Sequence, residues 1–145
     1  MPCMRLLAVL VLLAGLSACD TVRPLAVPEG QEASLVVYQP KSSYTEASSP
    51  FVYVDGHNQG RLGLEGVIRL SLPAGQHRIT TREPLLFWPG QESAVTELTV
   101  GAGETRYVRF FRQQVGVSFD STNNPHAEVR SSLSEVDAAQ GQARQ

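Results

Sequence analysis

The sequence has little charge of either sign. Charged side chains make up 18% of its 145 residues, and the formal net charge is −2, whereas about a quarter of the residues are charged in a typical globular domain. Disordered chains combine few hydrophobic residues with much charge, so a hydrophobic content of 42% excludes that class. Nucleic-acid-binding domains are strongly basic. The length and composition therefore predict one globular domain with no nucleic-acid partner.

The residues and motifs that many enzymes use are also scarce. The chain has two cysteines and three histidines, and no two histidines have the spacing of an HExxH zinc motif. It contains neither the GxSxG motif of a serine hydrolase nor a glycine-rich phosphate loop before a helix. The glutamates at or near the expected turns are typical of solvated surface residues. We expect no catalytic residues, no bound metal and no cofactor.

The main apolar stretch is too short to cross a membrane. It covers residues 6–16, behind Arg5, and a membrane-spanning helix needs about 20 apolar residues. A basic start, an apolar centre and small residues are the layout of a secretory signal peptide. The segment Leu16–Cys19, with the sequence LSAC, resembles the lipobox of bacterial lipoproteins. That resemblance implies a signal peptide over residues 1–18, cleavage before Cys19, and a diacylglycerol on the Cys19 sulfur. It places the chain on the periplasmic side of the inner or outer membrane, held by this lipid.

Nine prolines and twelve glycines argue against a helical bundle. Segments of alternating hydrophobicity predict strands at 35–38, 51–54, 60–62, 67–72, 77–82, 95–100, 105–112, 115–119 and 129–133. Short strands at such spacing are typical of an all-β antiparallel sandwich or barrel. We expect a β-sandwich domain over 35–133, a lipidated cysteine and tether over 19–34, and a tail or short helix over 134–145, capped by Ser134.

Two turns with characteristic sequences separate expected strands. Asp55 and Gly56 have the sequence of a type I′ hairpin turn, in which both central residues take positive φ. Gly60 begins the return strand of that hairpin, and the segment Pro73–Gly75 makes a further turn. We expect His57 at an exposed loop tip and His77 at the start of a strand, with no metal site between them.

Four blocks of sequence consist mostly of turn motifs: Val52–Gly56, Gly60–Leu62, Leu72–His77 and Gly103–Tyr107. They resemble the PEGA-type β-sandwich, and more narrowly a family of small bacterial lipoproteins of unknown function built on such a domain. The resemblance covers residues 35–113 and implies a surface-anchored accessory module with no catalytic residues. The chain has Pro-Ala-Gly-Gln at 73–76 where PEGA domains often have Pro-Glu-Gly-Ala. This departure favours the narrower lipoprotein family.

Arginines provide the first candidate interaction surface. The strands that contain Arg69, Arg78 and Arg106 can display a basic face beside Tyr107 or Phe111. The guanidinium fork of arginine binds carboxylates and phosphates. The alternative is a solvated face on which arginines pair across strands with Glu97 or Glu104. We expect the solvated face.

Four apolar residues between two prolines provide the second candidate surface: Leu85, Leu86, Phe87 and Trp88. Because proline lacks the backbone donor, we expect the segment to leave the strand ladder. It then either folds over an open end of the sandwich, which we favour, or remains an exposed patch for a partner.

Together these features predict a non-catalytic binding or accessory module of the bacterial envelope, bound to the membrane through Cys19, with an envelope protein as a possible partner. A small enzyme acting on cell-wall material, or a structural subunit of an envelope complex, is the alternative.

Overall fold

The computed structural model describes residues 20–41 and 48–143. Cys19, the expected signal peptide and part of the serine-rich loop after Lys41 lie outside the described residues. The described elements are β1 (Glu32–Tyr38), β2 (Phe51–Val54), β3 (His57–Arg61), β4 (Val67–Pro73), β5 (Gly75–Leu85), β6 (Trp88–Val100), β7 (Thr105–Phe119), β8 (Pro125–Val136) and α2 (Ala138–Gln142). The predicted all-β sandwich is confirmed.

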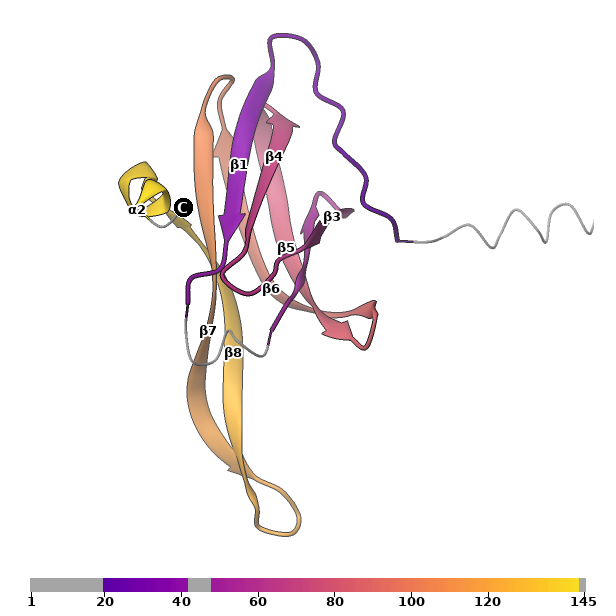
Figure 1. Ribbon diagram of the computed structural model, residues 1–145, viewed down its shortest axis with the longest axis vertical. Helices are drawn as coiled ribbons and strands as arrows, with labels where there is room; N and C mark the ends of the chain where they lie inside the picture. The colour runs from indigo at the N-terminus through magenta and orange to yellow at the C-terminus, as the bar shows by residue number, and fades with distance from the viewer. Residues whose placement is uncertain (1–19, 42–47, 144–145) are drawn as a thin grey trace, which may run out of the picture.

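The strands form two four-stranded sheets (Figure 1). The first sheet has the order β4-β1-β7-β8 and the second the order β3-β2-β5-β6. Among the described strands β1 pairs with β7 in parallel, and all other pairs are antiparallel. The parallel pair arises because the whole second sheet lies between β1 and β7 in the sequence, and so long a connection lets the chain return in the same direction.

The core lies between the two sheets. Each sheet contributes alternate side chains of its strands, as the hydrophobic alternation predicts. The first sheet supplies Leu35, Val37, Leu72, Val108, Phe110 and Leu133, and the second supplies Val52, Val54, Ile79, Ala94, Leu98 and Val100. Phe110 is the largest fully buried side chain among the described residues.

The β7–β8 hairpin is longer than the sequence predicts. The two segments expected at 105–112 and 115–119 form the single strand β7, which has a register shift between Gln114 and Gly116. Such a bulge bends a strand without ending it. The hairpin extends well beyond the rest of the sandwich (Figure 1).

The C-terminal helix is shorter than expected. Ser134 does not cap it, because Ser134 pairs with Arg109 in the β7–β8 ladder. The helix begins after Asp137 instead. Gly141 lies against the ring of Tyr107 so closely that a Cβ atom there would overlap the ring.

The segment expected to be a free tether packs against the domain. The amide nitrogen of Arg23 donates a hydrogen bond of 3.0 Å to the carbonyl oxygen of Asn58, and Gln59 Nε2 donates one of 2.9 Å to the carbonyl oxygen of Arg23. Leu25 packs against the core. The prolines of this segment prevent regular pairing, yet backbone groups of Asp20 and Arg23 bind the edge strand β3, so the segment lies against the domain at these residues. No helix among the described residues is long and apolar enough to cross a membrane.

Candidate functional site

The Asp55–Gly56 turn has the predicted backbone conformation. Asp55 has a φ of 50° and Gly56 a φ of 80°, as a type I′ turn requires. Gly60 and Gly75 also have positive φ, and the Gly60 amide donates a 2.8 Å hydrogen bond to Asn58 Oδ1. These residues therefore shape the second sheet.

The structure brings Asp55 and His77 together, which the sequence analysis did not expect. His77 Nδ1 lies 2.6 Å from Asp55 Oδ2, and His77 Nε2 lies 2.6 Å from the carbonyl oxygen of Pro73. The other carboxylate oxygen, Asp55 Oδ1, accepts a hydrogen bond of 2.9 Å from the amide of Arg78. Since His77 is 5% exposed and both of its ring nitrogens are engaged, it ties the β2–β3 turn to the end of β4.

The other two histidines lie elsewhere. His57 is exposed next to the Asp55–Gly56 turn. His126 lies on the long β7–β8 hairpin, with its Nε2 3.2 Å from Asp120 Oδ2. In the parts of the chain that the structure describes, no three histidine, cysteine or acidic side chains come together as a metal site would need.

The three arginines do not form one basic face. Arg69 and Arg106 belong to the first sheet, whereas Arg78 belongs to the second. This separation could not be predicted, because the order of the strands in the sequence does not reveal which sheet each strand joins. Arg78 pairs with Glu92 at 3.0 Å rather than with Glu97, the residue opposite it in the ladder.

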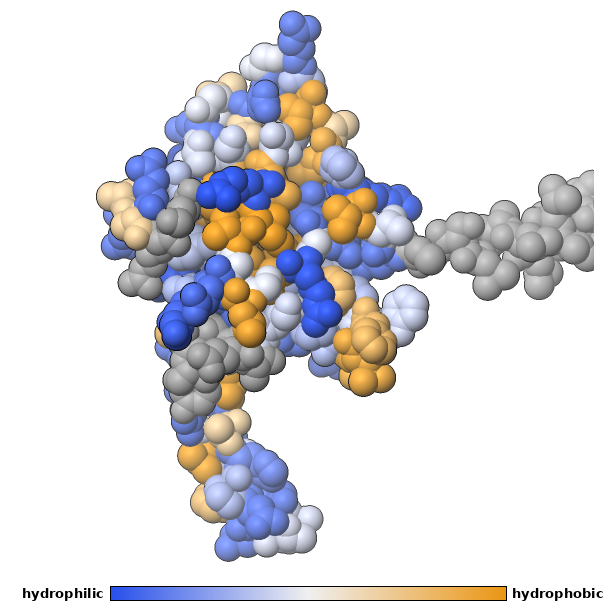
Figure 2. All heavy atoms as spheres, viewed as in Figure 1, coloured by the Kyte–Doolittle hydropathy of each residue, from blue (hydrophilic) through white to orange (hydrophobic). Residues whose placement is uncertain are grey.

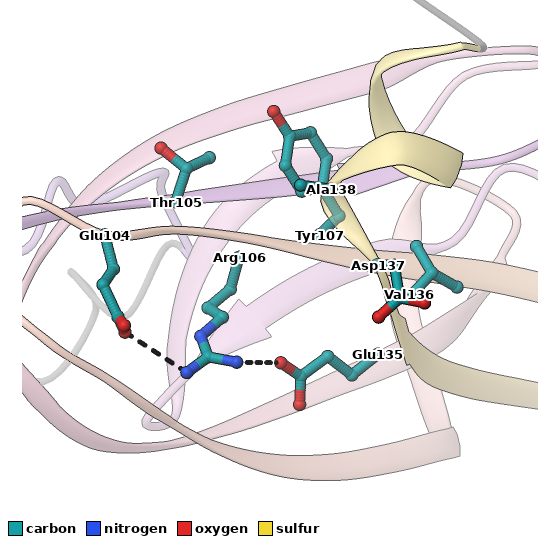
Figure 3. A pocket seen from close by; sticks show the side chains of 8 residues that line it. All are labelled: Glu104, Thr105, Arg106, Tyr107, Glu135, Val136, Asp137 and Ala138. Atoms are coloured by element: carbon teal, nitrogen blue, oxygen red, sulfur yellow. Dashed lines mark hydrogen bonds and ion pairs between the residues drawn. The ribbon is translucent and has the colours of Figure 1, made fainter.

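Arg106 is held between two carboxylates (Figure 3). Its Nη1 lies 2.8 Å from Glu135 Oε1, and its Nη2 lies 3.2 Å from Glu104 Oε2. Glu135 raises the pKa of Arg106 most, followed by Glu104. The hydrogen bond from the Gly101 amide, followed by the charge of Arg106, lowers the pKa of Glu104. The predicted pairing with Glu104 is therefore present, and Glu135, expected in a C-terminal tail or short helix, is a second partner from β8.

Two shallow hollows lie beside Arg106 and Arg69. The first has a volume of about 460 Å³ between the ends of β7 and β8 and the start of α2. The second, of about 320 Å³, is lined by Arg69 and shares Thr105 and Tyr107 with the first. Figure 3 shows Arg106 extending with Glu104 and Glu135 to one side of β7, and Tyr107 to the other. Arg106, the arginine of the first hollow, is paired with Glu104 and Glu135, so the hollow offers no unpaired arginine fork to an anion.

The apolar segment forms the tip of the β5–β6 hairpin, and both predictions about its backbone and burial are wrong. The ladder continues through the two prolines, because Pro84 lies opposite Pro89 and a register shift precedes Pro84. Both residues that lack a backbone N–H donor therefore belong to the same cross-strand pair, and the other pairs keep their donors. The segment does not cover the sandwich: the exposed fractions are 69% for Leu85, 82% for Leu86, 84% for Phe87 and 67% for Trp88. In Figure 2 these apolar atoms project from the body of the molecule at the lower right.

A cation–π pair of Arg82 and Tyr53 lies on the sheet that carries this tip, in contact with the first described residue. The guanidinium of Arg82 lies 4.8 Å from the centre of the Tyr53 ring. The Tyr53 hydroxyl donates a hydrogen bond to the carboxylate of Asp20, and Asn58 Nδ2 donates one of 3.1 Å to the Asp20 carbonyl oxygen. Burial, and then Asp20, raises the pKa of Tyr53 to about 12. Asp20 is thus fixed on the sheet that carries the apolar tip.

Comparison with known proteins places this fold in a family without an assigned activity. A search of curated proteins found no match. A family described as protein of unknown function, DUF2846, matches residues 29–123, from just before β1 to the turn after β7. This match covers more than half of the chain and the strands β1 to β7, and β8 follows it. The chain belongs to the DUF2846 family.

Proposed function

We propose that the protein is a lipid-anchored accessory module of the bacterial envelope that makes a non-catalytic contact through the β5–β6 tip. The observation that carries this proposal is the exposure of four consecutive large apolar side chains, Leu85 to Trp88. Exposed apolar groups gathered in one place are typical of interaction sites. A tip that served only to connect two strands would be more soluble with polar residues.

The position of the packed N-terminal segment supports the anchor. The lipobox-like sequence ends at Cys19, and the next residue, Asp20, is already hydrogen-bonded to β2 and β3. A diacylglycerol on Cys19 provides two acyl chains, each methylene contributing about 0.8 kcal/mol when buried. We also propose that the domain is of the PEGA-like type found in small lipoproteins, with which the two packed sheets are consistent.

The surroundings of the acidic and basic groups favour a binding role over catalysis. Asp55 and His77 meet, but His77 is buried and hydrogen-bonded through both ring nitrogens, so it has no nitrogen directed at a substrate. Arg106 is bound by Glu104 and Glu135. These groups stabilise the fold in their present arrangement.

Fatty-acid labelling tests the anchor. We expect a clickable palmitate analogue to label the wild-type protein in bacteria, and Cys19→Ala to lose the label because the mature chain has no other cysteine. Cys3→Ala is the matched control and should keep the label, since Cys3 leaves with the signal peptide. Undiminished labelling of Cys19→Ala would contradict the proposal.

A further inference from the structure

The residues at the apex of the β5–β6 hairpin are not those that the turn itself favours. Leu86 has a φ of 59°, and Phe87 is not among the residues with positive φ. Positive φ at the first central residue alone is the pattern of a type II′ turn, which prefers glycine there. A residue with a Cβ atom is strained in this conformation, because the Cβ approaches the following carbonyl oxygen. The fold therefore gains nothing from leucine at this position, and another role must account for it.

The tip is uncharged as well as exposed. The segment from Pro84 to Gln91 contains no charged side chain, and the two central side chains, Leu86 and Phe87, are more than four-fifths exposed. Trp88 lies at the base of the apex, opposite Leu85. Tryptophan combines an apolar body with a polar N–H group and is enriched at membrane–water interfaces for that reason.

The path of the chain places this tip near the residue that follows Cys19. Cys19 is one peptide unit, about 3.8 Å, from Asp20. Asp20 binds Tyr53, and Arg82 lies on the Tyr53 ring. From Arg82 the strand needs only four residues to reach Leu86, roughly 13 Å at about 3.3 Å per residue. In Figure 1 the indigo start of the described chain and the β5–β6 tip lie on the same side of the sandwich.

We infer that the β5–β6 tip inserts into the interfacial layer of the same bilayer that holds the lipid on Cys19. This inference rests on the proposed function, because the anchor is what fixes the distance between the tip and the membrane. Interfacial apolar side chains are buried about 5–10 Å into the boundary between headgroups and acyl chains, a depth that the projecting end of the hairpin can reach. A lipid at Cys19 and the tip then attach the domain at two points and set its orientation on the membrane.

The fluorescence of Trp88 tests this insertion in the full lipidated protein. Trp88 is the only tryptophan of the chain, so all tryptophan emission comes from the tip. The protein is reconstituted into vesicles of phosphatidylethanolamine and phosphatidylglycerol, with and without brominated acyl chains. We expect a blue-shifted emission that the brominated lipid quenches and that aqueous acrylamide quenches little. Emission that acrylamide quenches freely would overturn the inference. Protected emission that brominated lipid leaves unchanged would also overturn it, since a protein or a second copy would then cover the tip.

Variants separate insertion from folding. Leu86→Gly suits the turn and should keep or raise the unfolding midpoint in urea, while Phe87→Asp places a charge on an exposed side chain. Both should weaken quenching by brominated lipid, and Phe87→Asp should abolish it. Phe119→Asp is the matched control, because Phe119 is 63% exposed at the end of the other long hairpin. It should leave quenching unchanged; equal losses in Phe119→Asp and Phe87→Asp would overturn the inference.

Mass spectrometry of the same preparation distinguishes the two proposals. Acyl chains on the protein together with a freely quenched Trp88 would overturn the inference alone. A chain without acyl groups would overturn the proposed anchor, whatever the emission shows.

Discussion

Replacing His77 with alanine should destabilise the domain more than any other single histidine change. The substitution removes a buried ring that connects the Asp55–Gly56 turn to the carbonyl oxygen of Pro73, with both distances at 2.6 Å. A hydrogen bond contributes about 1 kcal/mol. The carboxylate of Asp55, which accepts the other bond, is 40% exposed. Because solvent weakens such a pair, we assign this bond about 1 kcal/mol as well, rather than the larger value of a buried charged pair. Loss of the ring from its packed site adds about 1 kcal/mol.

The expected loss is therefore about 3 kcal/mol of unfolding free energy, or a decrease in Tm of roughly 10–20 °C. Circular dichroism in urea and on heating measures both quantities. His57→Ala is the control, because the exposed His57 side chain contributes within about 0.5 kcal/mol. A double-mutant cycle with Asp55→Ala should give a coupling energy of at least about 0.5 kcal/mol. If His77→Ala matched His57→Ala in stability, or the coupling were zero, the assignment of His77 as a connection between the two turns would be refuted.

Two further experiments test other parts of the fold. Gly141→Ala should detach α2 from β7, since the new methyl group overlaps the Tyr107 ring. Hydrogen exchange should then accelerate in residues 138–142 and not in the core strands. Ala139→Ser, at an exposed helix position, is the control and should leave hydrogen exchange unchanged in both regions. Hydrogen bonds from the backbone of Asn124 first, and then from Thr122 and His126, hold the pKa of Asp120 well below its ordinary value of 3.8. Because the folded pKa is the lower one, this stabilisation is present above the ordinary value and is lost as the pH falls through the lowered pKa. An NMR titration of the Asp120 carboxyl carbon that shows an ordinary midpoint would contradict this arrangement.

The sequence alone determined the fold class and most strand positions. Alternation of apolar residues in segments such as Val67–Leu72 depends only on near neighbours, and it places one side of each strand in the core wherever that strand pairs. The positive φ of Asp55 and Gly56 could likewise be predicted, because turn conformation follows from two adjacent residues. The composition of the β5–β6 tip was also evident, although its exposure was not.

Only the tertiary structure decided which distant residues meet and which apolar residues remain in solvent. Asp55 and His77 are far apart in sequence, and their contact depends on the alignment of β2 with β5. Ser134 and Glu135 belong to β8 rather than to a helix because pairing with β7 supplies hydrogen bonds that a short, weakly capped helix cannot match. The tip residues are exposed, and the segment after Asp20 is bound to β3, because these outcomes depend on which surfaces the assembled sheets leave open. That property belongs to the packed sandwich, and no local segment of the chain carries it.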